Sequence, residues 1–184
     1  MEKISNYIDS KMPDTLGDAR GKVVLLSRFA NAPAGVNMYV ENPGTTGHQT
    51  VEHKIPDKPA QRFHIQDLQQ YKDSLGRTDI ADATSKKLDL VKQTLSFAAE
   101  TNAHSASYVS FVFNYASAVC NQTGRAVVVV PVNYHDTYSV SDRVQSSVVD
   151  HLKAHPKDKT GFLISNFITP DLAFMILKRN LGMF

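Results

Sequence analysis

Polar side chains stand where four apolar stretches of the sequence end, and their residue types suit the binding of a charged or hydroxylated ligand. These residues are Arg28, Asp67, Asn114 and Asn166. A guanidinium donates paired hydrogen bonds to a phosphate or carboxylate, and a carboxylate accepts hydrogen bonds from hydroxyl groups. In α/β folds such working residues lie at the carboxyl ends of the strands. The pattern therefore predicts a pocket for a polyol or a phosphate; the alternative is that each strand simply gives way to a polar loop.

The histidines offer weaker candidates for acid/base or metal chemistry. Residues 135–137 are His-Asp-Thr, but a His-Asp pair beside a threonine is common in loops. His151 and His155 are four residues apart, a spacing that can place two metal ligands on one helix face, and His48 and His53 are five apart. No third ligand accompanies either pair, so we predict solvated faces and no bound metal.

The elements that would position these groups alternate between strand and helix. Alternating or continuously apolar stretches predict strands, and an apolar period of about 3.6 residues predicts helices. The predicted strands are Lys22–Arg28, buried on both faces, and Arg62–Asp67, Tyr108–Asn114 and Gly161–Phe167. The predicted helices are Glu2–Lys11, Ile80–Thr101, Val140–Ala154 with a cap at Ser139 or Ser141, and Leu172–Asn180 with a cap at Thr169 followed by Pro170.

Two segments have no regular pattern. Ala30–Pro59 is rich in Gly, Pro and Asn and is long for a connection in a compact domain, so we expect a functional loop or an insertion there. Ala126–Val130 is apolar and β-branched, and it lies between Arg125 and Pro131. This leaves both a buried loop edge and the start of a short helix open.

Length and composition limit the class of protein. The chain has 184 residues, enough for one domain with a sizeable core. Its 20 basic and 18 acidic residues nearly balance, which gives no electrostatic case for nucleic acid as a partner. Cys120 is the single cysteine, so no intrachain disulfide forms, and cysteine usage does not indicate an oxidising or a reducing compartment. We find no secretory signal near Met1 and no apolar run of the roughly 20 residues that span a bilayer.

Alternation of strands and helices favours an α/β fold with parallel strands. Four strands are too few for a closed (β/α)₈ barrel, which takes about 250 residues. The chain is therefore either a small open α/β sheet or part of a barrel.

Four motifs resemble a known family. The stretch LGDARGKVVLLSRF, residues 16–29, resembles the one that opens the second half of the barrel in bacterial-type phosphatidylinositol-specific phospholipases C. The family's V-Q-D-x-Y strand is matched by Ile65-Gln66-Asp67, its Y-I-N-F strand by YVSFVFN at 108–114, and its G-W-V-I-Q-D-Y-I segment by GFLISNFI at 161–168. The resemblance implies a single domain over residues 1–184: an incomplete (β/α)₈ barrel of about the C-terminal four β/α units.

The resemblance also assigns roles to residues. It places the family's inositol-contacting arginine at Arg28 and its aspartate that binds inositol hydroxyls at Asp67. The position of the ring-facing tyrosine is held by Gln69, so Tyr71 serves only if the loop shifts. Asn166 replaces an aspartate that supports the base histidine, and this exchange removes the charge that stabilises an imidazolium.

The family reaction is the cleavage of phosphatidylinositol to diacylglycerol and inositol 1,2-cyclic phosphate, without a metal or other cofactor. The general acid and base of that reaction are histidines of the first barrel half, and the motifs found here belong to the second. We therefore expect this chain alone to be inactive, with a phosphodiester lipid head group as ligand and contact with a membrane surface. The alternative is a non-catalytic polyol or head-group binding module, or a half-barrel that depends on a partner. Open barrel edges would favour self-association.

Overall fold

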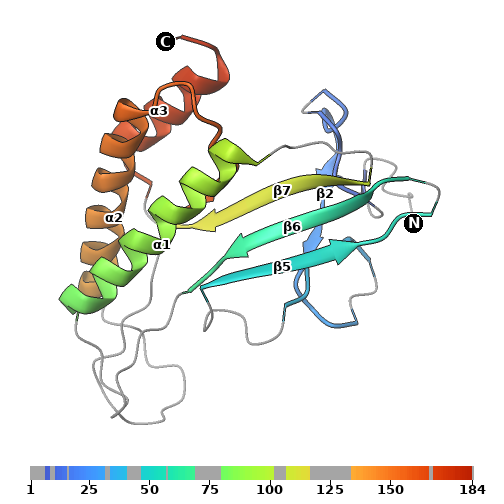
Figure 1. Cartoon of the computed structure of the whole chain (residues 1–184), viewed down its shortest axis with the longest axis horizontal. Coiled ribbons are helices and arrows are strands. Elements are labelled where there is room, and N and C mark those ends of the chain that lie inside the picture. The colour runs from blue at the N-terminus through green and yellow to red at the C-terminus, as the bar shows by residue number, and fades with distance from the viewer. Residues whose placement is uncertain are drawn as a thin grey trace. The chain divides into compact units, whose positions relative to one another are not determined.

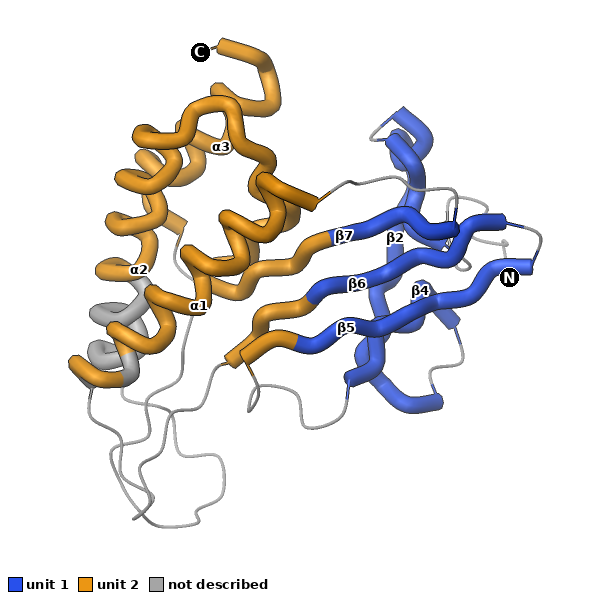
Figure 2. Tube along the Cα trace, viewed as in Figure 1, with its two compact units in different colours: residues 1–41, 49–64, 102–111 blue, residues 42–48, 65–101, 112–184 orange. Residues whose placement is uncertain are grey.

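The computed structural model describes most of the chain and divides it into two compact units. The described residues are 7–8, 11–15, 17–31, 34–40, 47–56, 58–68, 80–101, 107–116, 134–165 and 168–183. Unit 1 comprises residues 1–41, 49–64 and 102–111, and unit 2 comprises residues 42–48, 65–101 and 112–184 (Figure 2).

The largest sheet has four strands in the order β5-β6-β7-β8. Their bounds are His48–His53 for β5, Ala60–Gln66 for β6, Tyr108–Tyr115 for β7 and Phe162–Ile164 for β8. β7 and β8 pair in parallel, with Phe113 opposite Phe162. Figure 1 shows β6 and β7 running in the same direction and β5 running in the opposite direction. The sheet is therefore mixed, with its parallel part in β6, β7 and β8.

Three helices follow the parallel strands in turn: α1 (Ile80–Glu100), α2 (Tyr134–Ala154) and α3 (Pro170–Asn180). α1 packs against α2, and α2 packs against α3 (Figure 1). They enclose the apolar core of unit 2, which consists of Val91, Leu95, Ala116, Val144, Val148, Val149, Leu152, Leu172 and Met175. The strand–helix alternation confirms the predicted α/β class.

The start of α3 follows the predicted cap. Thr169 has an extended backbone, and its side-chain oxygen accepts a hydrogen bond from the backbone N–H of Leu172. Pro170 occupies the first turn, where its missing N–H costs no helical hydrogen bond. The Oε1 of buried Gln145 in α2 accepts from the backbone N–H of Thr169 at 2.8 Å, so the cap is also fixed to the neighbouring helix.

Unit 1 contains two small parallel pairs. β1 (Tyr7–Ile8) pairs with β2 (Val23–Val24), and β3 (Leu26–Ser27) pairs with β4 (Val36–Asn37). A helix over Glu2–Lys11 was predicted, but its described residues Tyr7 and Ile8 are extended because they form a ladder with β2. That prediction is wrong at those two positions.

One further prediction in unit 1 needs correction. Lys22–Arg28 is not one strand buried on both faces: it changes partner at Leu25, whose carbonyl accepts from Val36 N at 2.8 Å, and Val23 is 60% exposed. Ala30–Pro59, where we expect a functional loop or an insertion, contains the strands β4 and β5, which the sequence pattern did not predict. The side chains of β5 alternate between exposed and half-buried, and its polar sequence HQTVEH hid that alternation.

The predicted N-terminus of α2 was also wrong. The helix starts at Tyr134, before Ser139 and Ser141, so neither serine precedes it as a cap. Residues 135–137 therefore lie within a helix and not in a loop. The segment Ala126–Val130 lies outside the described residues.

Candidate functional site

The predicted site residues lie in different parts of the structure, and two of them are not described. Asp67 directly follows β6 and Asn114 lies near the end of β7; both belong to unit 2 and both are fully buried. Arg28 directly follows β3 and belongs to unit 1. Tyr71 and Asn166 lie outside the described residues. Asp67 and Asn114 are therefore the two predicted site residues whose surroundings in unit 2 the structure describes.

A lysine that the sequence analysis did not select contacts residues at the end of β6. Lys87, in α1, is fully buried, although lysine is almost never fully buried unless it is paired. Its Nζ donates hydrogen bonds to the backbone oxygen of Leu68 at 2.6 Å and to Oε1 of Gln66 at 3.0 Å. Lys87 precedes buried Val91 by four residues, so both lie on the face that α1 buries. That spacing was the available signal in the sequence.

The amides of Gln66 and Asn114 continue this polar cluster. Gln66 Nε2 donates to Asn114 Oδ1 at 2.9 Å and to the backbone oxygen of Tyr115 at 3.0 Å. Asn114 Nδ2 donates to the backbone oxygen of Val91 at 3.0 Å. The bonds run from α1 to the end of β6, on to β7 and back to α1, so they fix three elements where the strands end. Buried polar networks of this kind are stable only when their members are satisfied.

The charge of Lys87 is finely balanced. Burial lowers the pKa of Lys87 from 10.5 to about 7, and the Asp67 carboxylate acts in the opposite direction. Near neutral pH the amine is therefore present in both charged and neutral forms. The neutral form still has two N–H groups, which match the two acceptors on Gln66 and Leu68. Groups with strongly shifted pKa values cluster at functional sites, and they also occur in structural networks of buried charges.

His48, at the start of β5, contacts the same helix. Its Nε2 lies 2.6 Å from Thr94 Oγ1, and the Thr94 hydroxyl donates to the backbone oxygen of Leu90 at 2.7 Å. Because that hydroxyl proton is already used, Nε2 carries the proton and donates to Thr94. Burial lowers the pKa of His48, and Lys87 lowers it further. His48 is nonetheless exposed, as expected for a solvated histidine, while the Thr94 contact fixes its tautomer and the lowered pKa favours its neutral form.

His64, in β6, has a different environment. Its Nδ1 lies 3.1 Å from Thr50 Oγ1 in β5, and its Nε2 lies 3.5 Å from Ser110 Oγ in β7. Burial lowers the pKa of His64, with a further contribution from Arg62. These contacts join neighbouring strands across one face of the sheet, and they give His64 a role in strand pairing.

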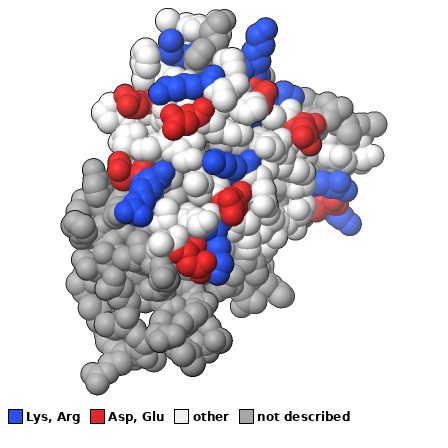
Figure 3. Space-filling view, turned by 60° about the vertical axis from the view of Figure 1, so that its left-hand side comes forward, with Lys and Arg blue, Asp and Glu red and all other residues white. Residues whose placement is uncertain are grey.

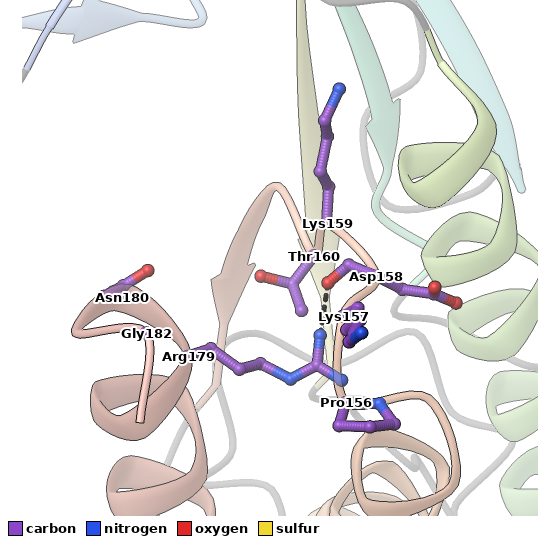
Figure 4. A pocket seen from close by; sticks show the side chains of 8 residues that line it. All are labelled: Pro156, Lys157, Asp158, Lys159, Thr160, Arg179, Asn180 and Gly182. Carbon is purple, nitrogen blue, oxygen red and sulfur yellow. Dashed lines mark hydrogen bonds between the residues drawn. The ribbon is translucent and has the colours of Figure 1, made fainter. Parts of the chain in front are cut away.

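A cavity of about 390 Å³ lies between the turn after α2 and the end of α3 (Figure 4). The guanidinium of Arg179 donates to the backbone oxygens of Leu152, His155 and Asp158. Carbonyls at the end of a helix lack intrahelical partners, so Arg179 satisfies the C-terminal end of α2. The other cations of the lining, Lys157 and Lys159, are exposed. We therefore assign this cavity a structural role and no ligand.

The described residues contain no group of three or more His, Cys, Asp or Glu side chains arranged to hold a metal. The rings of His151 and His155 lie 4.5 Å apart, and His155 Nδ1 lies 3.5 Å from the carboxylate of Asp158. Within the described part of the chain, no helix has the length and apolarity that crossing a membrane requires.

Comparisons with known proteins give no family assignment. No protein-family model matches this chain, and no curated protein matches it significantly.

Proposed function

We propose that this chain is part of a phosphatidylinositol-specific phospholipase C-like phosphodiesterase and that it supplies the side of the site that binds the lipid head group. The observation that carries the proposal is the position of Asp67. This carboxylate directly follows a strand of the parallel part of the sheet, is fully buried, and interacts electrostatically with the amine of Lys87, which is hydrogen-bonded to the two neighbouring residues. Ligands of α/β folds bind at the carboxyl ends of the strands, and a carboxylate in this position can accept hydrogen bonds from the hydroxyl groups of a ligand.

The proposed barrel origin is supported by the order of β6-α1-β7-α2-β8-α3, in which each parallel strand is followed by a helix. Such repeated units build (β/α)₈ barrels. The antiparallel edge strand β5 departs from that plan, since barrel strands are all parallel (Figure 1). In the proposal β5 is an addition within the segment that connects the family's first and second motifs.

In the proposed chemistry Asp67 accepts hydrogen bonds from hydroxyls of the inositol ring. The family resemblance, and not the described geometry, assigns a head-group contact to Arg28, a ring contact to Tyr71 and a place in the pocket to Asn166. None of these residues is a general acid or base, so the proposal gives this chain ligand binding and not bond cleavage. No metal or other cofactor takes part.

Titration of the chain with myo-inositol 1-phosphate by calorimetry tests the binding. We expect Asp67→Asn to weaken binding by about tenfold or more, because an amide cannot replace a charged acceptor in bonds of roughly 1.5–3 kcal/mol. Asp89→Asn is the matched control, since Asp89 is an exposed carboxylate on α1. Equal affinities for both variants and the parent would refute the assignment of Asp67.

Assay of the chain on phosphatidylinositol vesicles tests whether the chain binds the head group without cleaving the phosphodiester bond. We expect no release of inositol 1,2-cyclic phosphate by the chain alone. Turnover that persists in His135→Ala would contradict this, because the reaction would then use groups that we have not assigned to it. Binding without turnover, also after a histidine-bearing barrel half is added, would favour the alternative of a non-catalytic head-group binding module.

A further inference from the structure

The buried amine of Lys87 contacts both residues that flank Asp67. One hydrogen bond reaches the side chain of Gln66, which precedes Asp67, and the other reaches the backbone oxygen of Leu68, which follows it. The backbone N–H of Leu68 in turn donates to Gln66 Oε1 at 3.0 Å. These three contacts close a small ring of hydrogen bonds around the backbone of Asp67, so its conformation depends on the amine.

The helix end of this arrangement is equally fixed. Val91, one turn after Lys87, is fully buried in the core, and its carbonyl accepts from Asn114 Nδ2 in β7. Lys87 thus projects from a helix that is held by both apolar packing and a buried amide. A rigid support of this kind is what holds a binding group in its productive geometry.

We propose that Lys87 is the positioning residue of the Asp67 site, which holds the Asp67 carboxylate in place for a hydroxylated, phosphorylated ligand. This inference rests on the proposed function for the identity of the ligand, but not for the contacts themselves. Lys87 does not touch the ligand in this view, since the amine is buried behind the strand end and its donors are directed to Gln66 and Leu68.

The first test compares Lys87→Met with Lys86→Met in calorimetric titrations with myo-inositol 1-phosphate. Lys86 is the matched control, because it is adjacent on α1 but exposed, and its Nζ pairs with Asp82 at 2.7 Å. We expect Lys87→Met to weaken binding about tenfold, as the loss of a hydrogen bond to a charged group does, and Lys86→Met to bind like the parent. Parent-like binding by Lys87→Met would overturn the inference and leave the proposed function intact.

Amide hydrogen exchange separates positioning from general stabilisation. In Lys87→Met we expect faster exchange confined to the end of β6, with the Leu68 amide as the reporter, while amides in the middle of β7 keep their protection. Faster exchange throughout unit 2 would show a purely structural role and would overturn the inference.

NMR titration of the Lys87 ¹³Cε resonance in the parent decides the remaining cases. If Lys87→Met does not fold, saturating myo-inositol 1-phosphate should displace this resonance in the parent; an unchanged resonance despite binding would overturn the inference. If the parent binds no inositol phosphate, the proposed function fails, and Asp67→Asn then tests the link without ligand. A lowered Lys87 titration midpoint in Asp67→Asn supports the link between the two side chains, and an unchanged midpoint refutes it.

Discussion

A lysine in a helix is ordinarily assigned to the solvated face, and that habit concealed the most informative side chain of this protein. Lys87 shares a face with Val91 and Ala98, at intervals of four and eleven residues, and all three are buried. Asp67 and Asn114 do lie at the ends of β6 and β7, where the sequence pattern put them, and both are buried. That pattern did not show what surrounds them, because the partners come from helix α1 and from a neighbouring strand and depend on tertiary packing.

The lowered pKa of Lys87 predicts a stability that rises with pH. Between about pH 7 and 10.5 the folded amine is largely neutral while the unfolded one is still protonated, so the unfolded chain binds more protons. In this window the free energy of unfolding should increase by up to about 1.4 kcal/mol per pH unit from this group. Well below pH 7 the amine is protonated in both states, so Lys87 no longer contributes to the dependence of stability on pH.

Urea denaturation at intervals from pH 6 to pH 9.5 checks this slope in Lys87→Met, Lys86→Met and the parent. The difference in unfolding free energy between the parent and Lys87→Met should grow in favour of the parent as the pH rises above about 7. Lys86→Met should follow the slope of the parent. A pH-independent difference between the parent and Lys87→Met would show that the pKa of Lys87 is not lowered by folding.

At the scale of the elements, long periodic segments were predictable and short ones were not. Strands β6 and β7, helix α1 and the cap of α3 lie where the sequence pattern put them. The two-residue strands have no periodicity to detect, because each contains only two paired residues. The start of α2 was misplaced because a polar first turn has the composition of a loop, and only packing of its later turns shows that the helix extends so far.

One connection between elements depends on a glycine. Gly161, just before β8, has a φ of 64°, and a Cβ at this position would lie 2.5 Å from the backbone oxygen of Val112 in β7. The turn therefore requires both the left-handed conformation and the absence of a side chain. The close approach brings β8 into register beside β7.

Gly161→Ala should destabilise the chain more strongly than Gly182→Ala. Both glycines have a φ of 64°, but a Cβ on Gly182 would meet nothing within 4 Å. The conformational cost of roughly 1–2 kcal/mol is common to both variants, so the difference in their unfolding free energies isolates the collision with Val112. Thermal denaturation measures this difference. Equal decreases in unfolding free energy in the two variants would show that the chain accommodates the Cβ at position 161 without a further energetic cost.

At the scale of the whole molecule, the charges nearly balance, and on the visible face (Figure 3) opposite charges are interspersed. On the face drawn in Figure 3, lysines and arginines lie beside aspartates and glutamates over much of the described surface. The formal net charge is only +2. A nucleic-acid partner requires a patch of clustered positive charge to neutralise phosphates, and this face offers none in its described part.

We accordingly predict negligible binding of duplex DNA. Fluorescence anisotropy of a labelled 20-base-pair duplex at 150 mM salt should give a dissociation constant weaker than roughly 10⁻⁴ M, the weak end of non-specific binding. Lowering the salt should produce only a shallow increase in affinity. Tight binding with a steep dependence on salt concentration would reveal a cationic surface that contributes several phosphate contacts.

Two adjacent lysines differ completely in access to solvent, since Lys87 is fully buried and Lys86 is exposed. An amine-acylating reagent therefore modifies Lys86 directly, whereas it reaches Lys87 only in molecules whose first helix has locally detached. The ratio of the two acylation rates, measured by mass spectrometry on a single peptide, gives the free energy of that local opening. Neighbouring amines on one helix thus supply both the measurement and its internal reference.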